Sequence, residues 1–375
     1  NNIAPGNPAA TGQITLDAQS VTAEFDIADS AGPTLIAIDN ESVLGADVVI
    51  QGLIDNPAGT TTILTSGGVI RDDGADGAIR TNRLELAADA IGLPANRLDV
   101  ELVRSAGRPT GLSAESAGGV YLDLTGRLRE SDANHAVFDT GELSAGGDID
   151  LLLNAALQET TPVGFVQGIT FAVPQNTALN GVYVDHFHPD AGSATALDPA
   201  IYADTALATL IASGYAFGKL TAGANVIVKA QNGAAGATLV NVTAGTDLLG
   251  TGYLDFLTNG NIEITEQAGD LRILKIQSNA GDVSLEAADA MVGSIYEVTT
   301  SAADDGATPW VIGNGIALRA EHGAIAAIGD FLEINSSNQT SGAVDAFARD
   351  GVYVREIAAD LNIGAIVSQT SDVVL

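Results

Sequence analysis

Residues 252–285 read GYLDFLTNGNIEITEQAGDLRILKIQSNAGDVSL, and residues 342–375 repeat them as GAVDAFARDGVYVREIAADLNIGAIVSQTSDVVL. The two stretches align without a gap at an offset of 90, and twelve of their 34 positions are identical. Unrelated sequences would share only about two or three of these positions. A fixed internal period is typical of architectures in which one small unit stacks on the next. The sequence therefore predicts that most of the chain is one structural theme repeated.

The repeats contain short runs in which apolar and polar residues alternate. Such alternation indicates strands with one buried face, because successive side chains of a strand point to opposite sides. Gly, Asp and Asn stand between the runs, and these residues favour turns through positive φ angles or side-chain hydrogen bonds. The clearest runs and turns are Ile262–Ile264, Leu271–Ile273, Val283–Leu285, Asn259-Gly260-Asn261, Gly269-Asp270 and Gly281-Asp282.

The spacing of these strands points to one fold class. Strands recur roughly every 8–12 residues, which fits a sandwich, a barrel or propeller, or a β-solenoid. Very short strands, a long repeat and only 5% aromatic residues favour the last of these. We therefore expect an all-β fold, a right-handed parallel β-helix (β-solenoid), with coils of about 20–25 residues and a short helical insertion. The 90-residue offset would then cover about four coils. A weaker third copy aligns Gly119-Val120-Tyr121 with Gly351-Val352-Tyr353.

The insertion divides the expected coils into two groups. We expect coils over residues 1–157, an elaboration over 158–220 and further coils over 221–375. Within the elaboration, Asp198 suits a helix cap, Pro199 the first turn and Gly214 the end, so we expect a helix near 199–213. The last residues read as a strand in mid-pattern, which predicts that the natural polypeptide continues.

Several phrases carry a resemblance to a known group of proteins. They are GDLRILKIQSNAGDVSLEA, AGGVYLDLTGRL and ELSAGGDIDLLLNAA. They resemble the repeats of filamentous-haemagglutinin-like adhesins and giant bacterial surface repeat proteins, best over residues 80–155 and 220–375. The resemblance implies long right-handed parallel β-helices, export from a bacterial cell, and attachment or matrix roles at the cell surface. It supplies no catalytic residue.

The amino-acid composition excludes several functions and disfavours some classes of binding partner. With 15 basic and 47 acidic residues the net charge is −32, which disfavours nucleic acid and anionic membranes as partners. The absence of Cys rules out disulfides, Cys-ligated zinc and Cys catalysis. No apolar stretch is long enough to predict membrane insertion. We expect an extracellular or cell-surface protein that contacts itself, neighbouring segments of its own chain, or surface carbohydrate.

Two clusters are candidate metal sites. Asp72, Asp73 and Asp76 lie in one Gly-rich loop, and calcium prefers such carboxylate and carbonyl oxygens. His186, His188 and Asp190 are candidates for a transition metal, because two His two residues apart on a strand project from the same face. The simpler interpretation is turn-forming Asp and a solvated His pair. No cofactor is required by this reading, and calcium is the ion that the acidic loops suit.

An enzyme is the main alternative to a structural or adhesive rod. Asp148 and Asp150 are two residues apart, and polysaccharide hydrolysis needs a pair of carboxylates. However, Asp148 occupies the recurring Gly-Asp turn position, as Asp270 and Asp282 do, so it is expected to serve the repeat. We therefore expect no catalysis. A β-helix polysaccharide lyase or hydrolase and a calcium-dependent carbohydrate-binding module remain the alternatives.

Overall fold

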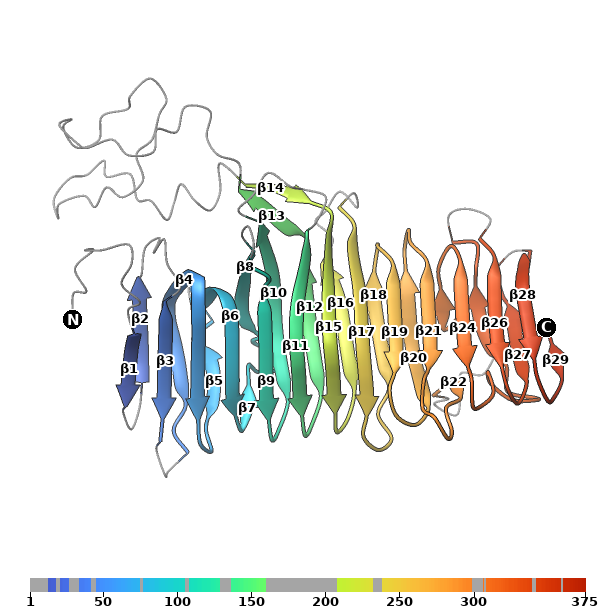
Figure 1. Cartoon of the computed structure of the whole chain (residues 1–375), viewed down its shortest axis with the longest axis horizontal. Helices are drawn as coiled ribbons and strands as arrows, with labels where there is room; N and C mark the ends of the chain where they lie inside the picture. The colour runs from blue at the N-terminus through green and yellow to red at the C-terminus, as the bar shows by residue number, and fades with distance from the viewer. Residues whose placement is uncertain are drawn as a thin grey trace, which may run out of the picture.

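The computed structural model consists of strands alone over the residues that it describes. These are residues 13–17, 21–26, 34–41, 45–74, 77–104, 108–128, 136–159, 208–231, 238–298, 306, 308–338, 342–358 and 360–375. They form 29 strands in one hydrogen-bonded network, stacked along the long axis of the molecule (Figure 1). In this part of the chain every pairing of named strands is parallel except one, which confirms the all-β prediction. No helix long and apolar enough to cross a membrane occurs among these residues.

The strands form three columns, in which each strand pairs with one from the layer before and one from the layer after. Column A runs the length of the stack. Its members are β1 (Gln13–Asp17), β3 (Leu35–Asn40), the second halves of β4 (Val48–Thr65) and β6 (Ala78–Ala88), β9 (Gly111–Ser116), β11 (Val137–Ala145), β15 (Ser213–Ala222), β17 (Val240–Leu248), β19 (Ile262–Glu266), β21 (Val283–Ala287), β24 (Ile316–Ala320), β26 (Val344–Ala348) and β28 (Ile363–Ser368).

Column B contains the strands that follow the turn after each column A strand. Its members are β2 (Val21–Asp26), the start of β4, β5 (Val69–Asp72), β7 (Ala90–Ile91), β10 (Val120–Leu128), β12 (Ile149–Asn154), β16 (Val226–Gln231), β18 (Leu254–Thr258), β20 (Leu271–Ser278), β22 (Ile295–Glu297), β27 (Val352–Glu356) and β29 (Val373–Val374). Isolated parallel bridges through Ile325 connect β22 to β27.

Column C is shorter and occurs at both ends of the stack. Near the N-terminal end, the middle of β4 and the start of β6 pair with β8 (Leu98–Arg104), the second half of β10 and β13 (Ala156–Glu159). Near the C-terminal end, the second half of β20 pairs with β23 (Val311–Ile312). In turn, β23 pairs with β25 (Leu332–Asn335), and β25 pairs with the second half of β27.

The interior is filled by side chains that stack in register from layer to layer. In column A, Ile38 pairs with Ile63, Ile63 with Leu86, and Leu86 with Ala114, and all four side chains are buried. Aliphatic residues fill the space because each stacks on a similar one, which explains why so few aromatic residues are needed. The alternation in the sequence is thus alternation between interior and surface. In β18, for example, Leu254, Phe256 and Thr258 are buried, and the two residues between them are partly exposed.

The 90-residue repeat does not return to the same column. Leu254 lies in column B, whereas Val344, its equivalent 90 residues on, lies in column A. Likewise Ile262 lies in column A and Val352 in column B. Three pairing steps lead from β19 to β26, and one change of column leads from β18 to β19, so the offset covers three and a half layers. The offset is half a layer less than four, and this is possible because both columns accept the same alternating strand pattern.

The helix expected near 199–213 is wrong in the part that the structure describes. Residues Ala208–Ile211 form β14, which pairs antiparallel with β13 from Ala156↔Ile211 to Glu159↔Ala208. Pairing with the exposed edge of β13 overrides the modest helix propensity of this segment. Residues 199–207 lie outside the described residues. The stack resumes at β15, so residues 213–220 of the expected elaboration belong to column A.

Candidate functional site

The structure describes two of the six predicted metal ligands, Asp72 and Asp73. Asp76, His186, His188 and Asp190 lie outside the described residues. Asp72 ends β5, and its Oδ1 accepts hydrogen bonds from Gly74 N at 2.8 Å and Asn96 Nδ2 at 2.5 Å. Asp73 follows it, and its backbone N donates to Ile50 O at 3.1 Å. Over the described residues, no group of three or more His, Asp or Glu is arranged to hold a metal ion.

The recurring Asp residues join one layer to the next, as the sequence predicted. Asp148 Oδ1 accepts hydrogen bonds from Asn225 N at 3.0 Å and Asn225 Nδ2 at 2.9 Å. Asp282 Oδ1 accepts from Gly315 N at 2.8 Å in the same way. These contacts satisfy backbone donors at the starts of strands that would otherwise lack a partner. Asp148 therefore joins its turn to the next layer.

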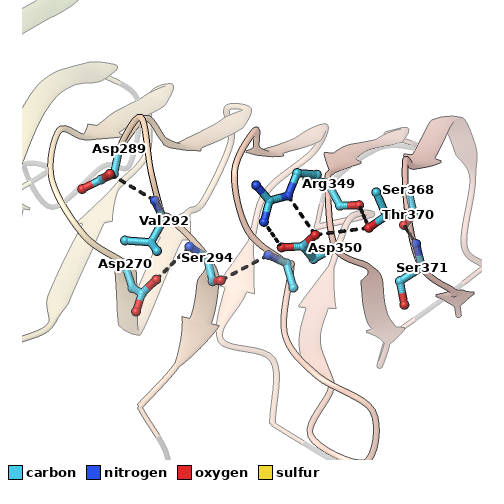
Figure 2. Close-up of polar contacts among 10 residues, drawn as sticks. Asp270, Asp289, Val292, Ser294, Arg349, Asp350, Ser368, Thr370 and Ser371 are labelled. Atoms are coloured by element: carbon cyan, nitrogen blue, oxygen red, sulfur yellow. Dashed lines mark hydrogen bonds and ion pairs between the residues drawn. The ribbon is translucent and has the colours of Figure 1, made fainter.

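Figure 2 shows a series of such contacts along one corner of the stack. Asp270 Oδ1 accepts a hydrogen bond from Ser294 N at 2.8 Å, and Ser294 Oγ accepts one from Ala324 N at 3.1 Å in the next layer. Asp289 Oδ1 accepts from Val292 N at 3.2 Å, and further along Asp350 forms an ion pair with Arg349 at 2.8 Å. Most of these acidic side chains are therefore committed to turns.

Among the side chains that the structure describes, one pair of carboxylates departs from this pattern. Asp99 on β8 and Asp123 on β10 lie directly opposite each other in parallel register. Both occupy outward positions, because the residues on either side of each are buried: Leu98, Val100, Leu122 and Leu124. Neighbouring strands lie about 4.8 Å apart, so the two carboxyl groups are close neighbours on the surface. Like charges directly opposite each other destabilise a sheet, which makes this pair the candidate functional site.

Polar side chains from two further layers surround this pair. Asn154, at the end of β12, donates a short hydrogen bond to Asp123 Oδ1. Arg97, just before β8, reaches across β10 to Asp150 Oδ2 on β12 at 2.8 Å. On the other side, Asp72 Oδ2 accepts a hydrogen bond from Asp99 N at 3.4 Å. The site thus extends over β5, β8, β10 and β12.

The pKa values of both carboxyl groups of the pair are raised. Partial burial, followed by the charges of Asp123 and Asp72, raises the pKa of Asp99 to about 6. Burial also raises the pKa of Asp123, against the opposing effects of the Asn154 hydrogen bond and the Arg97 charge. Two carboxyls that compete for one proton allow one to act as an acid and the other as a base.

A buried ionic network lies beside the carboxylate pair. Glu101 on β8 accepts hydrogen bonds from Arg127 Nη2 at 2.8 Å and from Arg80 Nε at 2.7 Å. Arg80 also lies 3.7 Å from Asp55, so acidic and basic side chains alternate from β4 to β10. Burial alone would raise the pKa of Glu101, but its hydrogen bonds with Arg127 and Arg80 lower it. The nearest cations are therefore already engaged and do not neutralise the pair.

A second copy of this region carries the opposite arrangement. In the downstream layers, Glu333 on β25 lies opposite Arg355 on β27, and their side chains form an ion pair at 3.1 Å. Arg355 also lies over the Phe331 ring, 4.7 Å from its centroid. Tyr353 occupies the repeat position of Tyr121, and in each copy a glycine lies two residues before the tyrosine. A Cβ added to Gly351 would lie 2.7 Å from the Tyr353 ring, and one added to Gly119 would lie 2.5 Å from the Tyr121 ring. The two strands of the predicted third copy therefore share a glycine packed against the ring of the tyrosine two residues later.

The sequence reasoning missed Asp99 and Asp123. The available signal was an Asp between two apolar residues in each of two neighbouring strands, Leu98-Asp99-Val100 and Leu122-Asp123-Leu124. That signal becomes informative only when the register between the strands is known. A separate cavity of about 390 Å³ is lined by small and polar residues such as Ala136, Ser213 and Thr243, with no acidic or basic residue.

Comparison of the chain with protein-family models, with curated proteins and with solved structures finds no match.

Proposed function

We propose that this chain is a right-handed parallel β-helix that serves as a structural or adhesive rod, secreted by or displayed on a bacterial cell. The observation that carries the proposal is the stacking itself. Column A continues from β1 to β28, and each strand within it pairs with the layers before and after. An extended stack of this kind gives stiffness and a long surface without a deep cleft.

The acidic turns add support. Side-chain oxygens of Asp148, Asp270 and Asp282 each accept a backbone N–H from the following layer. Residues of the chemically reactive types are thus used to join layers. The resemblance of the repeats to filamentous-haemagglutinin-like adhesins supports the same role, and no catalysis is part of this proposal.

Charge narrows the partners of the rod. Lys219 and Lys229 form ion pairs with Asp247 and Asp255, so even the few lysines contribute little free positive charge. A surface of net charge −32 repels polyanions. We therefore propose self-association, neighbouring segments of the same chain, or neutral surface carbohydrate as partners, with calcium as the ion that would bridge acidic surfaces.

Electron microscopy tests this proposal at two scales. The purified chain should appear as a rod, lengthened by about 4.8 Å for each layer. An antibody against the chain should label fibres or the cell envelope of the native source. Compact particles, or label confined to a soluble secreted fraction, would contradict a structural or adhesive role.

The Asp99–Asp123 pair favours a second candidate, a hydrolase of neutral polysaccharides. Glycoside hydrolysis uses two neighbouring carboxyls, and burial raises the pKa of both Asp99 and Asp123. The test is release of reducing ends from a panel of neutral polysaccharides, with Asp99→Asn and Asp123→Asn as inactive variants and Asp282→Asn as the matched control. Release that survives both substitutions, or no release from any substrate, would rule this candidate out.

A further inference from the structure

A carboxyl–hydroxyl link joins successive layers in both copies of the 90-residue repeat. Glu266 Oε2 accepts a hydrogen bond from Thr246 Oγ1 at 2.7 Å, and Glu356 Oε2 accepts one from Ser336 Oγ at 2.7 Å. Glu356 and Ser336 are each 90 residues after Glu266 and Thr246. In both copies the same carboxylate also accepts a backbone N–H from the layer before it. The link is therefore a repeated structural feature.

The two copies differ in how deeply the carboxyl is buried. Glu266 is 0% exposed and lies in the interior ladder of column A, between Thr246 and Ala287. Glu356 lies in column C, at the end of β27 that pairs with β25, and its side chain is only partly buried. Burial of an ionised carboxylate is costly even when two hydrogen bonds are present, so only the first copy carries that cost in full.

We propose that Glu266 is a pH-sensitive link between β17 and β19, which holds the two strands together more strongly in acid than at neutral pH. When protonated, the carboxyl accepts Leu248 N and shares a proton with Thr246 Oγ1 without a buried charge. When ionised, it keeps both acceptor roles but places a full charge in an otherwise aliphatic ladder. This inference does not depend on the proposed function of the rod.

The charged groups around Glu266 do not remove that cost. Asp247, on the same strand as Thr246, forms an ion pair with Lys219 at 2.8 Å. Arg272, from β20, donates instead to Gly252 O at 2.7 Å and to Leu248 O at 3.4 Å. On the outer face of β21, Glu286 lies 3.3 Å from Arg319. Each nearby cation thus has its own partner.

The way in which the stability of the β17–β19 contact depends on pH follows from the pKa shift of the Glu266 carboxyl. Burial raises the pKa of Glu266 above its ordinary value of 4.5, and this outweighs the hydrogen bonds from Thr246 and Leu248. A carboxyl with a raised pKa in the folded state stabilises that state fully below pH 4.5, and this stabilisation is lost as pH rises through the folded value. The β17–β19 contact should therefore open more readily at neutral pH.

Hydrogen exchange measured by mass spectrometry at pH values near 5 and 8, corrected for intrinsic rates, tests this inference on the intact chain. Peptides covering β17 and β19 report the first copy, and peptides covering β25 and β27 report the second within the same sample. We expect protection of the first copy to fall by about threefold or more relative to the second when pH rises. An equal change in both copies would overturn the proposal, and this comparison needs no variant.

Two substitutions sharpen the result. Glu266→Gln keeps the shape and both hydrogen bonds without an ionisable group, so protection of the first copy at pH 8 should match its value at pH 5. Glu356→Gln is the matched control and should leave the first copy unchanged. A first copy that remains pH-dependent in Glu266→Gln would assign the effect to another group and overturn the proposal.

Discussion

Two regions of the molecule have the same backbone and opposite electrostatics. The upstream region consists of the turn at 92–97 with β8 and β10, and the downstream region consists of the turn at 326–331 with β25 and β27. Both turns close with the same two backbone hydrogen bonds, Leu93 with Asn96 and Ala327 with Asp330. However, where the upstream region places Asp99 opposite Asp123, the downstream region places the buried Glu333 opposite Arg355. The scaffold therefore fixes the backbone and leaves the surface chemistry free to vary.

The largest difference between the regions should come from the buried network beside β8. Arg127→Ala leaves Glu101 and Arg80 buried without their full set of partners, and breaking such a buried pair costs about 3–5 kcal/mol. Arg355→Ala removes one partner of Glu333, which is only 1% exposed, but Arg355 itself is 43% exposed, so we expect a smaller loss of about 1–3 kcal/mol. Urea unfolding of both variants measures the difference. Equal losses would mean that the buried network adds no stability beyond that of the Glu333–Arg355 pair.

The two turns provide the next test, because one begins with Gly92 and the other with Ala326. Gly92 has φ 63° and Ala326 has φ 56°, so both occupy the left-handed region, which disfavours a side chain. A Cβ on Gly92 would lie 2.0 Å from Tyr121 O, so Gly92→Ala should destabilise by about 2–3 kcal/mol. Ala326→Gly should stabilise by about 0.5–1 kcal/mol. Thermal unfolding of the two variants measures whether each substitution raises or lowers stability. Destabilisation by Ala326→Gly would contradict this account of the turn.

A smaller effect is expected when one surface is converted into the other. Asp123→Arg places a cation opposite Asp99, as in the downstream region, and should raise stability at pH 7 by about 0.5 kcal/mol. Arg355→Asp makes the reverse change beside the buried Glu333 and should lower stability by at least this amount. Urea unfolding at low and high salt measures both, because screening should reduce each difference. A salt-independent effect would indicate altered packing instead.

The smallest effect concerns pH. The pKa of Asp99 is raised to about 6 in the folded state, so its contribution to stability is complete below its ordinary value of 3.8 and is lost as pH rises through about 6. Asp99→Asn should therefore flatten the pH dependence of unfolding between these values. The unfolding midpoint measured from pH 4 to pH 7 checks this, with Asp282→Asn as the control on a turn carboxylate. An unchanged profile in Asp99→Asn would locate the titration elsewhere.

The sequence predicted the features that each layer repeats. Alternating residues such as Ile262 and Ile264 became buried ladders, and Asp270 and Asp282 became turn residues that join layers. It could not predict the column of each strand, because strands in columns A and B obey the same pattern. The segment Ala208–Ile211 was misassigned because its structure depends on an edge strand more than 50 residues earlier in the chain. The Asp99–Asp123 pair was missed because only the register brings the two residues together.

The half-layer offset of the repeat has a consequence for how chains of this kind vary in length. Gain or loss of one 90-residue unit would keep every downstream strand compatible with the stack, since each column accepts the strands of the other. It would also rotate everything after it by half a turn about the long axis. A surface feature on one side of the molecule would then appear on the opposite side, with no change in its own sequence. Duplication alone can therefore redistribute what such a protein displays.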